Sequence, residues 1–210
     1  MLWLKRGMSS LARKLLRRLV EQSRTAIEDG IVPGSGGIAF LGDSITAGGR
    51  WDLLLPHLPT RNLGIGGDRT DHVLERIAPA IRLAPSKLFL LIGTNDLTVG
   101  VPVDTIAGNV ARILDELRRA LPNCSFYLQS VLPRTADYAP TIATLNERYR
   151  KIARERRATF VDLWPLFDDG KGALKASLTN DNLHLLGAGY VVWRDALASY
   201  LGGFQSSGAR

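Results

Sequence analysis

From residue 36 onward, short continuous apolar runs alternate with longer stretches in which apolar positions recur at helical spacing. Short apolar runs of this kind are typical of strands that are buried on both faces. Strands that alternate with helices indicate βαβ units and a parallel sheet with right-handed crossovers. The predicted strands are 37–41, 61–65, 87–92, 125–130 and 159–161, and the predicted helices are about 51–57, 69–82, 103–121, 140–157 and 187–201.

The first part of the chain has a different pattern, in which leucines recur at helical spacing and basic residues occupy the positions between them. This pattern predicts a basic amphipathic helix across about residues 9–29. Charges interrupt its apolar stretch, so it matches neither a membrane span of roughly 20 apolar residues nor a secretory signal with a small-residue cleavage site. The apolar positions are Leu11, Leu15, Leu16, Leu19 and Val20.

We therefore expect two parts, an N-terminal extension over residues 1–35 and one α/β domain over residues 36–210. The chain has 210 residues, of which 45% are hydrophobic, and this is enough for the core of one domain. Its one cysteine, Cys124, cannot form an intrachain disulfide. Together with the missing secretory signal, this favours a cytoplasmic protein.

The net charge of +7 is concentrated in the extension. Residues 1–24 hold seven basic residues and one acidic residue, whereas the remaining residues hold 20 basic and 19 acidic residues. The body is therefore near neutral, and no motif of a nucleic-acid-binding module accompanies the charge, so we expect no nucleic-acid partner. Three roles stay open for residues 1–29: packing of the leucines on the body, which we favour, a subunit contact in a homodimer, and peripheral docking on an anionic membrane.

In open parallel sheets, ligands bind at the carboxyl ends of the strands, so the residues that follow each strand are informative. Gly42-Asp43-Ser44-Ile45-Thr46 follows the first predicted strand. It places a serine on a strand-to-helix turn, where its own N–H can face a developing negative charge. The block is neither the G-x-S-x-G elbow nor a P-loop. A simple helix-capping serine is the alternative.

Two further blocks follow the second and third strands. Gly66 and Gly67 allow a close approach of backbone to ligand, but Arg69 breaks the dinucleotide-binding spacing, and a flexible turn is the alternative. The Asn95 amide, in Gly93-Thr94-Asn95-Asp96, can donate to an oxyanion without adding charge, and an Asx-turn is the alternative.

Near the end of the chain, Asp181 stands three residues before His184. Such an Asp can hold one ring nitrogen and leave the other as a base. A surface Asp–His pair without function is the alternative. Metal binding is not expected, because His57 and His72 lie elsewhere in the chain and no metal-ligand motif is present.

Taken together and in this order, the four blocks resemble those of the SGNH hydrolases, also called the GDSL esterase/lipase superfamily, across residues 36–201. Two of the motifs are most similar to those of the branch of platelet-activating-factor acetylhydrolase-like proteins and bacterial acetylesterases. They are Asn-Leu-Gly-Ile-Gly-Gly-Asp over residues 62–68 and Gly-Thr-Asn-Asp over residues 93–96. Ile45 stands where the name-giving motif has leucine, which is a common variant.

The resemblance implies a three-layer α/β/α sandwich around a flavodoxin-like parallel sheet of about five strands. It also implies that Ser44 is the nucleophile, that His184 is its general base and that Asp181 orients the imidazole. The implied oxyanion hole consists of the N–H groups of Ser44 and Gly67 and the side-chain amide of Asn95. No metal or cofactor is implied.

The expected substrate is a small-molecule carboxylic ester with a short acyl group such as acetyl, because the connections are short and contain no lid-like apolar insertion. One alternative is a lysophospholipid or lipid esterase that works at a membrane through the N-terminal helix. A non-catalytic binding module on the same fold is another. Six apolar residues near the motifs could line an acyl slot, with plain core packing as the alternative for each. They are Leu97, Val99, Val101, Leu178, Leu183 and Leu185.

Overall fold

A computed structural model describes residues 10–202 of the chain. Its centre is one sheet of five parallel strands in the order β2-β1-β3-β4-β5. The predicted α/β class and flavodoxin-like order are confirmed, and each strand begins and ends within one residue of its predicted bounds. The strands are β1 (Ile38–Gly42), β2 (Thr60–Gly64), β3 (Lys87–Leu91), β4 (Ser125–Gln129) and β5 (Thr159–Val161).

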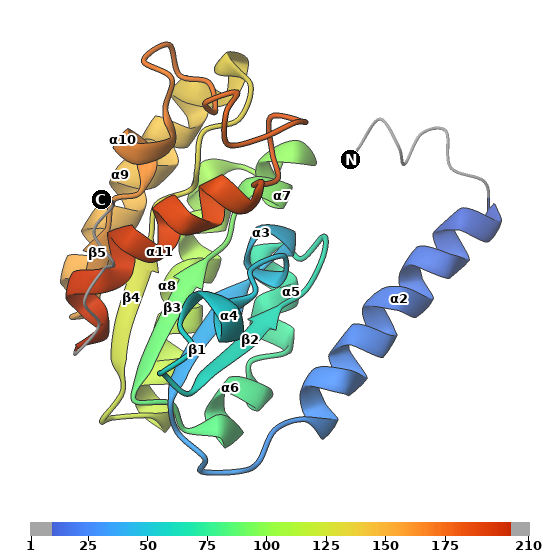
Figure 1. Ribbon diagram of the computed structural model, residues 1–210, viewed down its shortest axis with the longest axis vertical. Helices are drawn as coiled ribbons and strands as arrows, with labels where there is room; N and C mark the ends of the chain where they lie inside the picture. Colours follow the sequence, from blue (N-terminus) through green and yellow to red (C-terminus); the bar gives the residue numbers. More distant parts are fainter. Residues whose placement is uncertain (1–9, 203–210) are drawn as a thin grey trace.

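Helices cover both faces of the sheet and form the expected three layers, with α11 crossing in front of the strands and α8 lying behind them (Figure 1). One layer contains α5 (Thr70–Glu75), α6 (Ala78–Leu83), α8 (Val103–Ala120) and α9 (Ala139–Glu155). The other contains α3 (Ser44–Ala47), α4 (Trp51–Leu54) and α11 (Gly187–Leu201). The shorter elements are α7 (Thr94–Thr98), the 3-10 turn η1 (Ala136–Tyr138) and α10 (Trp164–Phe167).

Alternation along the strands divides the apolar residues between two cores. Ala39 and Leu41 of β1 face the helices α5, α6, α8 and α9, whereas Ile38 and Phe40 face α11. On the α11 side, the Phe40 ring stacks on Trp51 with centroids 3.8 Å apart. The Trp51 indole in turn donates to Thr46 O at 3.1 Å. This contact anchors the short helix that begins at Ser44 to the core.

Proline explains the two helices whose predicted extents are wrong. The predicted helix over 69–82 is divided into α5 and α6. Pro79, in the first turn of α6, has no N–H to donate to the carbonyl oxygen four residues earlier, so it cannot extend the helix that α5 begins. The predicted helix over 51–57 ends at Leu54, because Pro56 disfavours helical backbone at Leu55.

Among its described side chains, helix α2 (Ser10–Asp29) contacts the body through Arg24, Ile27 and Glu28, toward its C-terminal end (Figure 1). Ile27 packs against the core, and the Glu28 carboxylate pairs with Arg82 at 2.8 Å. Leu15 and Leu19 are 58% and 51% exposed, so the expectation that the leucines of this helix pack on the body is wrong for these two. Residue 9, where the helix was expected to begin, lies outside the described residues.

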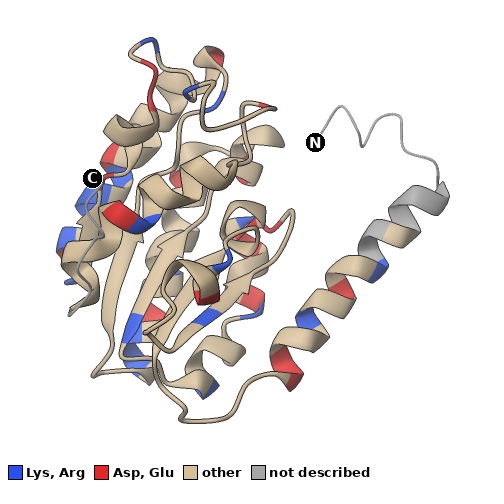
Figure 2. Cartoon of the chain, viewed as in Figure 1, with Lys and Arg blue, Asp and Glu red and all other residues tan. Residues whose placement is uncertain are grey.

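In the view of Figure 2, basic and acidic positions are interspersed along the helices and loops of the body. This matches the near-equal numbers of basic and acidic residues that follow residue 24. Among residues 10–202, every helix is too short or too polar to cross a bilayer.

Candidate active site

The nucleophile candidate Ser44 begins α3 directly after β1. Asp43 caps this helix by accepting a hydrogen bond from Ile45 N–H at 2.9 Å. Gly42 is needed here because a Cβ at this position would lie 2.2 Å from Leu91 O and 2.3 Å from Thr46 Oγ1. The Ser44 N–H belongs to the first turn of a helix, where backbone donors have no intrahelical acceptor. It is therefore available to a ligand.

Asn62 of β2 fixes the other end of α3. Its Nδ2 lies 3.1 Å from the carbonyl oxygens of Thr46 and Ala47 and 2.9 Å from Gly49 O. Its Oδ1 accepts from Gly64 N–H at 2.9 Å. Backbone carbonyls at the end of a helix otherwise need water as a partner. This one side chain joins the nucleophile turn to the neighbouring strand.

Ser44, His184 and Asp181 form one hydrogen-bonded chain. Ser44 Oγ lies 3.0 Å from His184 Nε2, and His184 Nδ1 lies 2.7 Å from Asp181 Oδ2. Asp181 Oδ1 accepts the N–H groups of His184 at 2.7 Å and Leu183 at 3.0 Å. The left-handed backbone of Asn182 (φ 57°) closes this tight turn. The sequence block thus folds so that the imidazole is held by one nitrogen and presents the other to the serine.

The carboxylate of Asp181 is held in its ionised form. Partial burial acts to raise its pKa, but hydrogen bonds from the His184 side chain and from the N–H groups of His184 and Leu183 lower the pKa to about 2. An ionised carboxylate fixes the proton on Nδ1 and stabilises an imidazolium when one forms. The side chains of Asp181 and His184 are 46% and 42% exposed, so a substrate can reach the imidazole.

The three expected oxyanion donors follow strands that are neighbours in the sheet, β2, β1 and β3. Gly67 lies in the turn after β2 with a φ of +81°, a conformation that favours glycine. Asn95 is buried in α7, after β3, and its Nδ2 donates to Asp68 O at 2.9 Å. A primary amide has a second N–H, which remains for a ligand. The Asn95 bond also ties the loop after β3 to the loop after β2.

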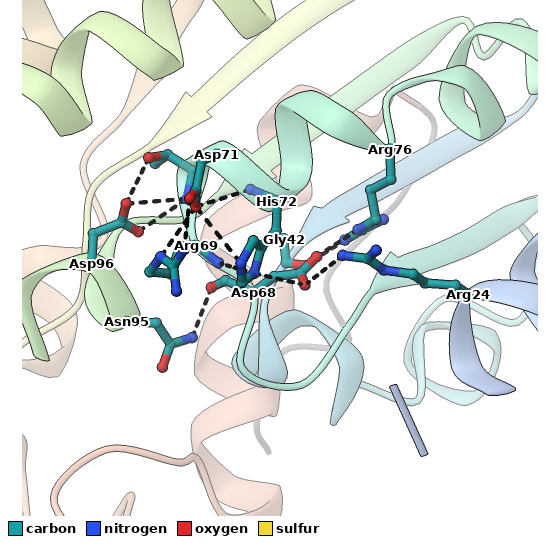
Figure 3. Close-up of polar contacts among 10 residues, drawn as sticks. Arg24, Gly42, Asp68, Arg69, Asp71, His72, Arg76, Asn95 and Asp96 are labelled. Carbon is teal, nitrogen blue, oxygen red and sulfur yellow. Dashed lines mark hydrogen bonds and ion pairs between the residues drawn. The ribbon is translucent and has the colours of Figure 1, made fainter. Parts of the chain in front are cut away.

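A buried ion pair lies behind these donors (Figure 3). The carboxylate of Asp68, the residue after Gly67, is 1% exposed and accepts from Arg76 Nε at 2.5 Å. Arg76 Nη2 donates to Gly42 O at 3.0 Å. One guanidinium therefore connects the turn of Gly67 to the end of the strand that carries Ser44. Arg24 of α2 approaches the same carboxylate at 3.8 Å.

Sequence reasoning missed Arg76 and the role of Asp68. The available signal was periodicity, because Arg76 stands three residues after Val73 on the buried side of the segment. A charged residue at such a position needs a buried partner.

Asp96 holds the start of α5 in a similar way. Its carboxylate accepts Thr70 N–H at 3.0 Å and Thr70 Oγ1–H at 2.6 Å. Burial raises the pKa of Asp96 above its ordinary value, and the hydrogen bonds from Thr70 oppose this shift. The segment between Gly67 and α5 is thus fixed at both ends.

Asp43 is a titratable group that the sequence did not single out. Burial raises its pKa to about 7, against the hydrogen bond from Ile45 N–H, and the nearby charges of Asp68 and Asp96 add to the rise. Its Oδ2 is buried and has no hydrogen-bond partner among the described residues. A carboxyl group that changes charge near neutral pH therefore stands next to the nucleophile.

The six apolar residues named as a possible acyl slot fall into different environments. Leu97 and Val101 pack with the core on the α8 side. Leu178, Leu183 and Leu185 belong to the core on the α11 side. Val99, at the end of α7, is 41% exposed. Core packing accounts for the four buried leucines, whereas Val101 is partly buried and Val99 is the most exposed member of the set.

Within the part of the chain that the structure describes, no three His, Cys, Asp or Glu side chains group closely enough to hold a metal ion. His57 and His72 lie apart from Ser44 and His184, and His72 contacts Asp68 and Asp71 instead.

Residues 40–192 match the model of the GDSL-like lipase/acylhydrolase family. A curated human relative, platelet-activating factor acetylhydrolase IB subunit alpha1, is 29% identical over 178 residues, which cover 78% of this chain and 74% of the relative. A solved structure from Streptococcus pneumonia, provisionally described as a platelet activating factor, is 29% identical with a TM-score of 0.79, covering 92% of this chain and 100% of the other. A catalytic mutant of an acetylxylan esterase from Geobacillus stearothermophilus has the same fold, with 21% identity, a TM-score of 0.68 and coverage of 84% and 99%.

Proposed function

Since the chain belongs to the GDSL-like lipase/acylhydrolase family, as a match over residues 40–192 shows, we propose that it hydrolyses short-chain carboxylic esters with Ser44 as nucleophile. The membership confirms the resemblance drawn from the four sequence blocks and makes the protein a carboxylic ester hydrolase. The roles of individual residues in the reaction and the identity of the acyl group are our proposals.

The observation that carries the proposal is the chain from Ser44 through His184 to Asp181, with contacts of 3.0 and 2.7 Å. A serine hydroxyl is a weak nucleophile at neutral pH unless a base accepts its proton. His184 Nε2 takes the proton as Ser44 Oγ bonds to the ester carbonyl carbon. The imidazolium then protonates the leaving alcohol, and an acyl-serine remains. Water, deprotonated by the same imidazole, releases the acid and restores Ser44.

The negative charge that develops on the carbonyl oxygen is stabilised by the N–H groups of Ser44 and Gly67 and by the second N–H of Asn95. These donors are held in place before substrate arrives, so no reorganisation is needed as charge develops. The support is local: Asn95 Nδ2 is fixed on Asp68 O, and the Ser44 turn is fixed by its Asp43 cap. Each such donor contributes about 2.7–4 kcal/mol of transition-state stabilisation in comparable sites.

An acetyl group is the acyl part that we propose. The human relative and the Geobacillus esterase are both named for acetyl esters. The leucines expected around the acyl group are packed in the core, and Val99 is the exposed member of that set. This arrangement favours a short acyl group.

A panel of p-nitrophenyl esters from acetate to palmitate, with an acetylated xylooligosaccharide and a lysophospholipid beside it, tests the acyl preference. We expect kcat/KM to be highest for acetate and to fall as the chain lengthens. A maximum at long chains, or on the lysophospholipid, would favour a lipid esterase instead. That candidate has one specific observation in its favour, the exposed leucines of α2.

Titration with a serine-reactive phosphonate separates an enzyme from a binding module. We expect one equivalent to react with the protein and none with Ser44→Ala. Ser9 and Ser10 provide matched controls, because both are serines outside the four blocks. Labelling that persists in Ser44→Ala would overturn the assignment of the nucleophile.

A further inference from the structure

The proposed ester-hydrolase mechanism does not use α2, although residues 1–24, which include most of this helix, hold most of the net charge of the chain. Residues 1–24 carry seven basic residues and one acidic residue. The structure divides α2 into two parts. Its last turns attach to the body through Ile27 and through the ion pair of Glu28 with Arg82. Farther toward its N-terminus, the described side chains of Leu15 and Leu19 are exposed and are not among the residues that pack on the core.

Leu15 and Leu19 stand four residues apart, so they share one face of the helix. They are 58% and 51% exposed, and Arg18 beside them is exposed as well. Leu11 and Leu16 extend the same apolar spacing in the sequence, and bases stand at 13, 14 and 17. A helix with leucines on one face and bases on the other is the form that lies in the interface of a bilayer.

We propose that α2 docks this protein on an anionic phospholipid surface. Leu15 and Leu19 enter the boundary between headgroups and acyl chains, and the basic residues of the segment lie against lipid phosphates. Each basic residue near such a surface contributes roughly 1 kcal/mol in membranes that contain anionic lipid.

The positive charge of residues 1–24 favours an anionic bilayer over a second copy of the chain as the partner of α2. A second copy would bring another segment with seven bases and one acid beside the first, and like charges at an interface oppose association. The rest of the chain has no net acidic charge to compensate, because 20 basic and 19 acidic residues follow residue 24. An anionic bilayer supplies both the apolar layer that the leucines need and the opposite charge.

One contact connects α2 with the neighbourhood of the site. In Figure 1, α2 begins at the end of the molecule where α3 and α7 follow their strands, and it runs back toward the start of β1. Arg24, between the exposed leucines and the attached turns, reaches Asp68 behind the expected oxyanion donors. The proposed docking concerns binding only and stands or falls without the ester-hydrolase assignment.

The test is sedimentation of the full-length chain with vesicles of phosphatidylcholine alone or with about 30% phosphatidylserine, a content typical of anionic leaflets. We expect binding to the anionic vesicles only. Raising the salt from about 0.1 M to 0.5 M should weaken it by roughly tenfold or more, because the screening length shrinks. Equal binding to neutral vesicles, or no binding to either, would overturn the proposal.

Substitutions on α2, with controls on the body, test which face of the protein binds the vesicles. The double variant Leu15→Ser/Leu19→Ser should lose roughly tenfold or more in affinity for anionic vesicles. Leu53→Ser is the matched control, because Leu53 is 65% exposed on α4 and should leave binding unchanged. Arg18→Glu should weaken binding, whereas Arg61→Glu, at an exposed arginine of β2, should not.

Two measurements keep these results interpretable. Hydrolysis of a water-soluble ester should be the same in the α2 variants as in the parent, since neither leucine contacts the site. Sedimentation velocity in the absence of lipid tests whether two copies of the chain associate through α2. A concentration-dependent dimer that the leucine substitutions abolish, with vesicle binding unchanged, would assign this face to self-association and contradict membrane docking.

Discussion

The guanidinium of Arg76 and the carboxylate of Asp68 form a buried ion pair that joins two of the three strand ends around Ser44. Arg76 Nε binds Asp68 at 2.5 Å, and Arg76 Nη2 binds Gly42 O at 3.0 Å. The Asp68 carbonyl oxygen accepts the Asn95 amide at 2.9 Å and so brings in the third strand end. The expected oxyanion donors are therefore held by residues that never touch the substrate.

Arg76→Gln should lower both stability and turnover. Removing one partner of a buried pair leaves an uncompensated charge, which typically costs about 3–5 kcal/mol. The shifted Gly67 turn should reduce kcat by roughly tenfold or more with little change in KM, because a misplaced donor acts on the transition state. Urea unfolding and steady-state kinetics measure the two effects.

Arg82→Gln is the matched control for Arg76, because Arg82 forms a surface pair with Glu28. It should change the unfolding free energy by about 1 kcal/mol or less. If Arg76→Gln lowered stability but left kcat unchanged, the pair would be a stabilising element without a positioning role.

Asn95→Ala should reduce kcat by roughly 10²-fold or more while KM changes little, because its amide is proposed to act in the transition state. Asn123→Ala, in the exposed turn before β4, is the control and should be as active as the parent. An unchanged kcat in Asn95→Ala would remove the side chain from the oxyanion hole and leave the two N–H groups.

Ser44→Ala and His184→Ala should both abolish measurable ester hydrolysis, and the double variant should be no worse than either single one, because the two residues act as a unit. Asp181→Asn should retain more activity, since the nucleophile and the base are both still present. The deficit of Asp181→Asn should be present at every pH above 4, because the pKa of Asp181 is about 2. Initial rates with p-nitrophenyl acetate measure all four variants.

Asp43→Asn should change the pH dependence of stability. The folded carboxyl, with a pKa of about 7, retains its proton where an unfolded carboxyl of pKa 3.8 has released it. A raised carboxyl pKa makes stability fall as pH rises from about 4 to 7. Asn keeps the cap and does not titrate, so its unfolding free energy relative to the parent should rise over this window.

Chemical denaturation at pH 5, 6, 7 and 8 measures the difference in unfolding free energy between Asp43→Asn and the parent. Asp52→Asn, at an exposed carboxylate, should show no such trend. Asp43→Ala should show the same pH trend as Asp43→Asn but should be less stable than Asp43→Asn by about 1 kcal/mol at every pH, since it also removes the cap. A parallel response of Asp43→Asn and the parent would show that the carboxyl is already ionised at pH 5.

Most strands could be predicted from the sequence because they are short apolar runs that end in a glycine or polar turn. The edge strand β2 (Thr60–Gly64) is more polar, with one large apolar residue, Leu63. The same turns predicted Ser44, His184 and Asp181, and the structure brings them within hydrogen-bond distance. The break between α5 and α6 was missed although Pro79 marks it. Periodicity continues across a kink, so pattern alone does not divide the segment.

Other features depend on contacts between distant parts of the chain. Arg76 acts on Gly42, which lies 34 residues earlier, and no local pattern indicates such a bond. The exposure of Leu15 and Leu19 could not be predicted either, because an amphipathic pattern shows that an apolar face exists but not what it contacts.

Ser44 and His184 are 140 residues apart in the sequence, whereas Gly42, Gly67 and Asn95 all lie within the first half of the chain. A ribosome makes the chain from its N-terminus, and the early strands can begin to pair before the later ones emerge. The proposed oxyanion donors are therefore synthesised long before the proposed base. In the proposed mechanism hydrolysis requires the Asp181–His184 turn, so we expect esterase activity only after synthesis has passed this point and the segment has packed against Ser44.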